Sequence, residues 1–323
     1  MTKKSIIILI IVGIIVLAGG VFYLSKQLKP KKIFFGASEK ISSTGFSTQI
    51  IRIYGIDKKY GLDLVVDYND PTLTMNKLLN KEFDAAILAP ISAAKANLEG
   101  KKIRIFGVAL WNVTSLAVRK DSPYKTLEEL KGKKLGTLGQ ITGTYTNMAL
   151  LAHEKGWRLE QDFNLVIGTK EDLVKFLKNG DVDFALIREP QASKLLATGE
   201  IREITNHDEL WKQLTGERFV FTGIAAHEDW LKTHKKEAKK LVQVFLEANK
   251  FIQENPDLIE KHKDLLGLQT PEEVALAKTR IPGSFPTEWN QSSVDNINSL
   301  IKKAAEAGII TKIPEDPIVL ILD

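Results

Sequence analysis

Two hydroxyl-rich loops are the segments of this sequence that could hold a polar or anionic group. One contains Ser43 and Thr44, and the other contains Gly139, Thr142 and Thr144. Each loop follows a strand-like run and precedes a helix-like run, so amides at the helix start could bind an anion while the hydroxyls form hydrogen bonds. The same residues would also serve as helix caps and turns. The pattern alone therefore predicts either a polar ligand site or two capped turns.

Two further loops carry polar or rigid residues directly after buried, strand-like runs. Residues 89–92 contain Pro90, and residues 188–190 are Arg188, Glu189 and Pro190. Ligands of open α/β sheets bind beyond the carboxyl ends of the strands. We therefore expect the four loops to face one another across a cleft, with Pro90 and Pro190 at equivalent strand ends.

Several classes of catalytic and metal site are excluded by composition and spacing. The chain has no cysteine, and its five histidines show no spacing typical of metal ligands. It contains no HExxH motif, no GxSxG nucleophile elbow, no Walker A loop and no GxGxxG fingerprint. We accordingly predict no catalytic residue, no metal and no cofactor.

The elements that would position these loops are written in a phrase that occurs twice. Residues 75–90 read MNKLLNKEFDAAILAP and residues 173–190 read LVKFLKNGDVDFALIREP. In both, an apolar period typical of a helix leads to an Asp, Asp84 or Asp183, then to a short apolar run that ends near a proline. We expect each Asp to begin a buried strand and to bind backbone amides of the preceding turn.

Matched strands and helices on either side of this phrase indicate two α/β units of similar order, although any α/β protein alternates strand and helix. Mostly parallel sheets with helices on both faces follow from that order. The length of 323 residues suits two doubly wound lobes. The net charge of +5 is too balanced to indicate a nucleic-acid partner.

The N-terminus predicts the cellular location. An uncharged run from Ile6 to Leu24 follows Lys3 and Lys4 and is long enough to span a bilayer. We predict an uncleaved signal anchor that holds the body at the extracytoplasmic face of the membrane. The alternative is a cleaved signal peptide and a secreted or periplasmic body. Lysines that follow the run leave a cytoplasmic body open as well.

Several of these segments together carry a family resemblance. The run KKYGLDLVV at 58–66, the phrase LLNKEFDAAILAP, the Ser122–Pro123 turn and LKGKK at 130–134 resemble the type II solute-binding proteins of ABC importers. The most similar group binds nitrate, sulfonates, taurine or thiamine precursors. The resemblance implies two lobes joined by two crossings, near residues 109–115 and 219–225, that close on a ligand like a flytrap.

The resemblance also implies the domain organisation. Residues 1–30 would be the anchor or signal and its linker, and residues 31–112 the first part of lobe I. Residues 113–221 would form lobe II. Residues 222–323 would complete lobe I and add C-terminal helices, in which Leu241, Val244, Phe245, Ala248 and Ile252 form one apolar stripe. We expect the body to be a monomer.

The implied function is capture of a small polar or anionic solute and its delivery to a membrane permease with its ATPase. Arg188 could then pair with a sulfonate, carboxylate or phosphate and Glu189 with an amine or hydroxyl, or the two could pair with each other. The residues that we expect to bind the ligand are Ser43, Thr44, Pro90, Trp111, Asn112, Gly139, Thr142, Thr144, Arg188 and Glu189.

Two other functions remain open at this point. One is a membrane-anchored sensor of the same ligands, and the other is a pyrimidine or thiamine-precursor enzyme on the same fold. The absence of cysteine excludes an enzyme that uses a cysteine nucleophile. The sequence does not distinguish nitrate, alkylsulfonates, pyrimidines or riboflavin-like heterocycles as the ligand.

Overall fold

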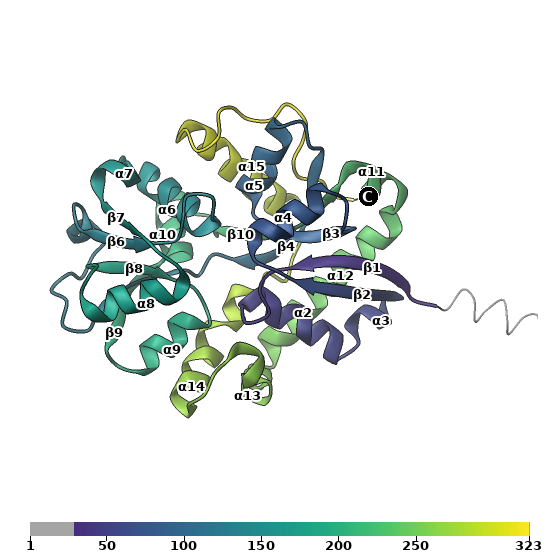
Figure 1. Cartoon of the computed structure of the whole chain (residues 1–323). Coiled ribbons are helices and arrows are strands. Elements are labelled where there is room, and N and C mark those ends of the chain that lie inside the picture. Colours follow the sequence, from purple (N-terminus) through teal and green to yellow (C-terminus); the bar gives the residue numbers. More distant parts are fainter. Residues whose placement is uncertain (1–28, 323) are drawn as a thin grey trace, which may run out of the picture.

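The computed structural model describes residues 29–322. Within that range the strands form two five-stranded sheets, in the orders β2-β1-β3-β10-β4 and β7-β6-β8-β5-β9. We call the part built on the first sheet lobe one and the part built on the second sheet lobe two; they lie side by side in Figure 1. The expected α/β fold with two lobes is therefore confirmed.

Lobe one alternates strands and helices along most of its first part. Its elements are β1 Lys31–Ala37, α2 Ser43–Ile53, α3 Ile56–Lys59, β2 Leu62–Tyr68, α4 Pro71–Leu79, β3 Ala85–Leu88, α5 Pro90–Leu98, β4 Ile103–Trp111 and the returning β10 Val220–His227. The C-terminal elements are α11 Glu228–Thr233, α12 Lys235–Glu254, α13 Asp257–Lys261, η2 Lys263–Leu266, α14 Pro271–Arg280, η3 Pro282–Ser284 and α15 Gln291–Glu306.

Lobe two is built from one continuous stretch of chain. Its elements are β5 Ser115–Arg119, η1 Glu128–Leu130, β6 Lys134–Thr137, α6 Gly143–Glu154, α7 Leu159–Asp162, β7 Asn164–Ile167, α8 Lys170–Asn179, β8 Phe184–Ile187, α9 Gln191–Ala197, β9 Ile201–Asn206 and α10 His207–Thr215.

Strand pairing fixes where the chain passes between the lobes. In lobe one β1 pairs parallel with β2 and β3, whereas β10 runs antiparallel between β3 and β4. The chain passes from β4 to β5 through residues 112–114. It returns from α10, which packs on α6, to β10 through residues 216–219. Most of the segment 219–225, where we expected the second crossing, is therefore part of a central strand.

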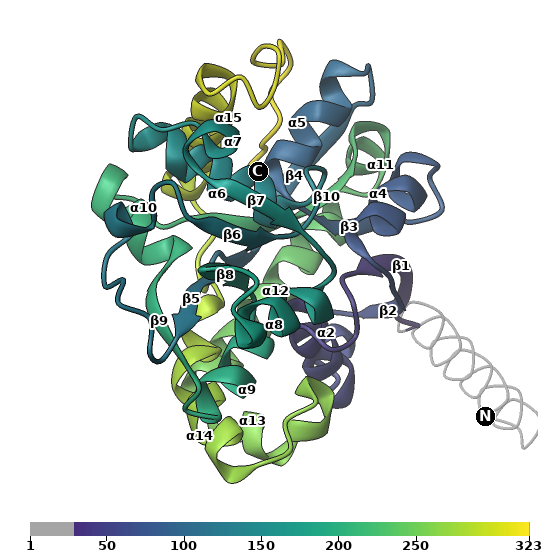
Figure 2. The ribbon, with the colours of Figure 1, turned by 60° about the vertical axis from the view of Figure 1, so that its left-hand side comes forward.

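Apolar side chains bury both faces of the lobe-one sheet. Along β3, Ala86 and Leu88 belong to the cluster that contains α5, and Ala85 and Ile87 belong to the cluster that contains α12. A strand that alternates between two buried faces carries the continuous apolar run seen in the sequence. Helix α15 lies beside α5 on one side of the sheet (Figure 2).

The apolar stripe predicted for α12 faces the interior of lobe one. All five of its residues are buried: Leu241, Val244, Phe245, Ala248 and Ile252. The ring of Phe245 packs on Phe35 of β1, with centroids 5.3 Å apart. Among residues 29–322 no helix is both long and apolar enough to cross a membrane, and the run from Ile6 to Leu24 lies outside the described residues.

Asp84 and Asp183 immediately precede buried strands, as predicted, but they do not bind the amides of the preceding turn. Oδ2 of Asp84 accepts a hydrogen bond from the amide of Phe34 in β1 at 2.8 Å, and Oδ2 of Asp183 accepts one from Lys134 in β6 at 2.8 Å. The amide of each Asp donates back to the carbonyl of the same residue at 2.9 Å. Each Asp thus fastens the start of one parallel strand to its neighbour.

We expect Asp84→Ala and Asp183→Ala each to lower the free energy of unfolding by about 1 kcal/mol, because each leaves a strand amide without its carboxylate acceptor. The two losses should add, since the residues lie in different lobes. Urea denaturation of the single and double variants measures them. Ligand affinity should stay at the wild-type level, and a large loss of affinity would contradict this assignment.

Candidate binding cleft

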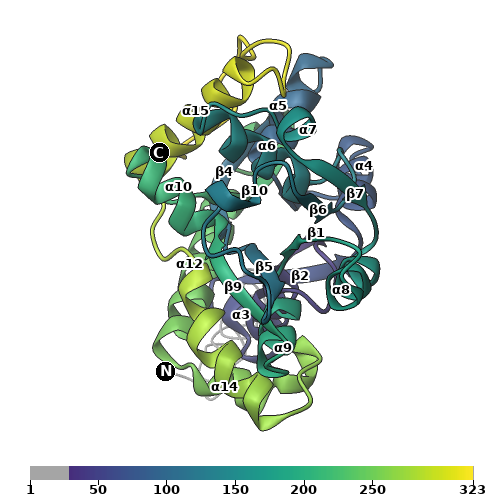
Figure 3. The same ribbon diagram turned by 90° about the vertical axis from the view of Figure 1, so that its left-hand side faces the viewer.

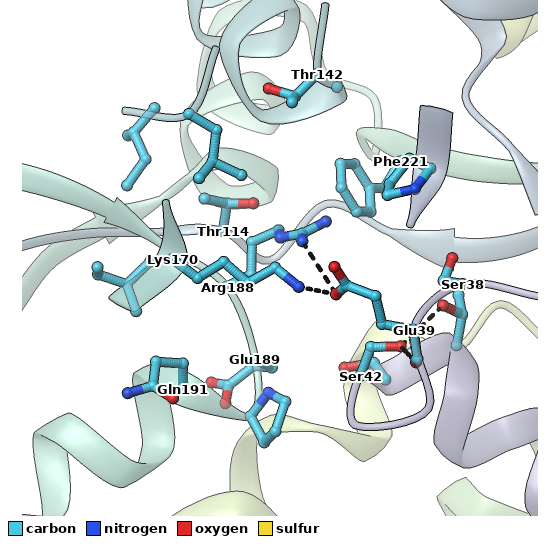
Figure 4. Close-up of a pocket in the computed structure, with 18 of the residues that line it drawn as sticks. Ser38, Glu39, Ser42, Thr114, Thr142, Lys170, Arg188, Glu189, Gln191 and Phe221 are labelled. Atoms are coloured by element: carbon cyan, nitrogen blue, oxygen red, sulfur yellow. Dashed lines mark hydrogen bonds and ion pairs between the residues drawn. The ribbon is translucent and has the colours of Figure 1, made fainter. Parts of the chain in front are cut away.

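A cleft with a volume of about 730 Å³ lies between the two lobes. Its lining combines loops at the carboxyl ends of strands in both sheets, and Figure 4 shows the centre of it. From lobe one these include residues 38, 39, 41–44 and 70–72, and from lobe two residues 138, 139, 142, 143, 168–171 and 186–191. The loops that the sequence predicted at the strand ends thus meet, except for residues 89–92.

Five helices begin at the cleft. The first residues of α2, α4, α6, α8 and α9 all line it. Each of these helices follows a strand whose carboxyl end lies at the cleft, so their amino ends meet there. The first amides of a helix have no acceptor within the helix, and its amino end carries a partial positive charge. The cleft therefore favours anions before any charged side chain is considered.

The loop before α2 is held against the helix start by side-chain and backbone contacts. Ser42 accepts a hydrogen bond from the amide of Gly45 at 3.0 Å and donates one to the carbonyl of Glu39 at 2.6 Å. A Cβ at Gly45 would lie 2.3 Å from the Glu39 carbonyl oxygen and 2.5 Å from that of Lys40. The loop can take this position only because residue 45 is glycine. Ser43 and Thr44, which precede the capped amide, line the cleft.

Three cationic residues of lobe two, Lys170, Arg188 and Lys194, line the cleft, and the first two lie near the same carboxylate of lobe one. The Arg188 side chain is 24% exposed and lies over the ring of Phe221, 5.9 Å from its centroid. Burial lowers the pKa of Arg188 to about 10, so the guanidinium stays charged at neutral pH. Burial and the nearby Arg188 charge lower the pKa of Lys170 to about 8. An anion bound between the lobes would stabilise the charged forms of both side chains.

One carboxylate of lobe one reaches these cations. Oε2 of Glu39 contacts Nζ of Lys170 and lies 3.9 Å from Nη2 of Arg188 (Figure 4). Glu39, Lys170 and Phe221 were not among the predicted site residues. Lys170 could have been found, because Gly168 and Thr169 form a third polar loop between a strand and a helix.

Glu189 lines the cleft, but its carboxylate already has partners. Oε1 accepts a hydrogen bond from Nε of Arg280 at 2.6 Å, and Oε2 accepts one from the Ser193 hydroxyl at 2.8 Å. The Glu189 side chain is 1% exposed. Nη2 of Arg280 also donates to Glu203 at 2.6 Å and to the Ser115 hydroxyl at 2.8 Å. The protein cation that pairs with Glu189 is therefore Arg280 and not the neighbouring Arg188.

Arg280 belongs to the C-terminal helix α14, which packs on α9 of lobe two (Figure 3). The segment that we expected to complete lobe one thus also contacts lobe two. The charge of Arg280 is disfavoured by its burial and favoured by Glu203 and Glu189, and the net effect raises its pKa. An ion-pair network of three side chains consequently lies next to the loop that carries Arg188.

The other predicted residues divide into three groups. Ser43, Thr44, Trp111, Gly139 and Thr142 line the cleft together with Arg188. Asn112 also borders it, but its side chain is buried and bound to His207, with Nδ2 and Nδ1 3.0 Å apart. Burial lowers the pKa of His207 to about 3, so this pair is neutral.

Pro90 and Thr144 form the third group, since both are buried and neither belongs to the cleft lining as residues 29–322 define it. Pro90 occupies the first turn of α5, and Thr144 is the second residue of α6. Pro190 lines the cleft and Pro90 does not, so the two prolines follow equivalent strands, β3 and β8, but do not both face the cleft. Among the described residues, no group of three or more histidines and carboxylates is placed to hold a metal ion.

We expect Arg280→Ala to lower the free energy of unfolding by about 2 kcal/mol, because it leaves the buried Glu189 carboxylate without its cation. Lys278→Ala on the same helix is the matched control. Lys278 makes exposed ion pairs with Asp257 and Glu260, which should contribute less than about 1 kcal/mol. Urea denaturation measures the free energy of unfolding of both variants. Equal losses would show that the Arg280–Glu189 pair contributes no more to stability than an exposed ion pair.

Solved structures resemble the whole body of the chain. The periplasmic aliphatic sulphonate binding protein SsuA from Escherichia coli superposes with a TM-score of 0.72 at 16% identity, over 88% of this chain and 96% of that one. The alkanesulfonate-binding protein SsuA from Xanthomonas axonopodis pv. citri, solved with MOPS bound, has a TM-score of 0.72 at 14% identity, over 90% and 99%. The desulfurization enzyme DSZB has a TM-score of 0.61 at 12% identity, over 88% and 94%.

Comparisons of sequence add the family. No curated protein matches the chain. The family model described as "NMT1/THI5 like" matches residues 58–259. This range runs from within α3 into α13 and contains the strands β2 to β10, so it includes most of the cleft lining but not β1 or the loop after it. Since the match extends over more than half of the sequence, the protein belongs to the NMT1/THI5-like family.

Proposed function

We propose that this protein is the extracytoplasmic substrate-binding component of an ABC importer, and that it captures a small anionic solute between its lobes. The observation that carries the proposal is the convergence of five helix starts with Arg188 and Lys170 on one cleft. Helix starts and guanidinium groups bind sulfonates, carboxylates and phosphates through hydrogen bonds assisted by charge. The sulfonate-binding proteins with the same fold favour a sulfonate or a related oxyanion.

Ligand contacts come from both lobes in this proposal. Ser43 and Thr44 of lobe one would donate to the anion from their amides and hydroxyls, and Trp111 would contact its apolar part. Gly139 and Thr142 of lobe two would bind it together with Arg188. A ligand that touches both lobes stabilises the closed state relative to the open state. Closure around the two crossings would then give the permease and its ATPase a form to recognise.

Four of the predicted residues receive a supporting role. Asn112 and His207 form a neutral buried pair at the first crossing, and Glu189 holds the Arg188 loop to α14. Pro90 and Thr144 belong to helix starts behind the lining. We propose that the body acts as a monomer outside the cytoplasm, held at the membrane by the segment from Ile6 to Leu24.

Calorimetry with methanesulfonate, nitrate, phosphate and a pyrimidine tests the proposal, in a buffer without sulfonate because a relative binds MOPS. Arg188→Ala should weaken binding of the preferred anion about tenfold to a hundredfold, the effect of one charged hydrogen-bond partner. Lys175→Ala, an exposed cation on α8, is the matched control and should leave affinity unchanged. Equal affinity of Arg188→Ala and wild type would place the ligand elsewhere. Mass spectrometry of the bound compound checks for turnover.

Anion affinity should fall as the pH rises through the pKa of Lys170, about 8. The charged amine binds the anion, so binding is strongest below that pH and is lost as the amine deprotonates. We expect the affinity to decrease about threefold to tenfold between pH 7 and pH 9. Lys170→Arg should flatten the profile because arginine stays charged in this range. Titrations at four pH values measure it, and the same slope in both proteins would exclude Lys170 as the group responsible.

A further inference from the structure

Glu39 occupies the position between the lobes where an anion would be expected to bind. Its Oε2 contacts Lys170 and faces Arg188, and the two cations belong to lobe two whereas Glu39 belongs to lobe one. The contact therefore spans the cleft. All three side chains are only partly exposed, Glu39 at 33% and Lys170 at 35%, so water screens the charges less than on an open surface.

Two other carboxylates of the cleft lining, those of Asp70 and Glu189, are held by different partners. Asp70 caps α4 by accepting hydrogen bonds from Thr72 and Leu73 at 2.9 and 3.0 Å. Glu189 is bound to Arg280. Glu39 differs from them because it belongs to the loop between β1 and α2. The backbone of this loop is fixed by the Ser42 hydrogen bond and by the close approach of Gly45. Its side chain extends from that fixed loop to the opposite lobe (Figure 4).

We infer that Glu39 is a tethered anion that holds the ligand-free cleft closed and that the ligand must displace. This inference rests on the proposed function for the identity of the displacing anion. The carboxylate neutralises the same two cations that would bind the ligand, so ligand and Glu39 compete for one position. A contact made only in the closed state raises the population of that state. The same contact lowers the apparent affinity by the free energy needed to break it.

The competition has a selective effect. An anion that forms hydrogen bonds with both lobes replaces the lost contact and keeps the lobes together. An anion that binds only Lys170 and Arg188 displaces Glu39 without restoring a link to lobe one, so closure is lost. Glu39 therefore discriminates against anions that make no contact with Ser43, Thr44 or Trp111.

The experiment combines small-angle X-ray scattering of the ligand-free protein with calorimetry of methanesulfonate binding. Glu39→Gln should increase the radius of gyration of the ligand-free protein and strengthen methanesulfonate binding about threefold to tenfold. Glu99→Gln, which removes one exposed carboxylate of lobe one away from the cleft, should change neither quantity. Lys170→Gln removes the partner, so it should also increase the radius of gyration but weaken binding. The double variant should be no more open than either single variant.

Each outcome separates this inference from the proposed function. If Glu39→Gln keeps the radius of gyration of the wild-type protein, the inference is overturned. It is also overturned if this variant binds methanesulfonate more weakly, because Glu39 would then be a ligand contact. If Glu39→Gln and Lys170→Gln both open the protein while none of the tested anions binds any variant, the contact that closes the cleft is established and the anion-binding function fails.

Discussion

The chemistry of this molecule depends on a constraint of parallel sheets. Before a strand can pair parallel with the preceding strand, the chain must return to the amino end of the sheet. Here a helix makes that connection. Consequently β1 and β2 of one sheet and β6, β7 and β8 of the other all end at the cleft, and the helices that follow these five strands begin there. The partial positive charge of the cleft is thus produced by the backbone. Arg188 and Lys170 add to a field that the fold already supplies.

The same constraint explains what the sequence could predict. Alternation of strand-like and helix-like runs was enough to locate both α/β units, the loops at 38–45 and 139–145, and the buried strands after Asp84 and Asp183. The position of Ser43, Thr44, Gly139 and Thr142 at the cleft could be predicted because a hydroxyl-rich turn between a strand and a helix is visible locally. The second crossing was misplaced because β10 reads as an apolar run whether it joins the lobes or fills a gap between β3 and β4.

The local sequence pattern could not predict which polar side chains pair with each other. Glu189 follows Arg188 directly, but its partner is Arg280, 91 residues away. Asn112 is bound to His207, 95 residues away, and Glu39 to Lys170 across two lobes. Whether a polar residue is free for a ligand depends on such distant partners. The absence of Pro90 and Thr144 from the cleft lining has a related reason, because a residue at a helix start can face the cleft or the core.

The position of β10 also determines the order in which the chain can complete its parts during synthesis. Lobe two draws every strand from residues 115–206, so its sheet can form as soon as that stretch has left the ribosome. The sheet of lobe one lacks its fourth strand until Val220–His227 has been made, and β3 and β4 have no strand between them before then. The first lobe to begin is therefore the last to be finished. A nascent chain that stops after lobe two would expose an unpaired edge of β3, the kind of edge on which aggregation starts.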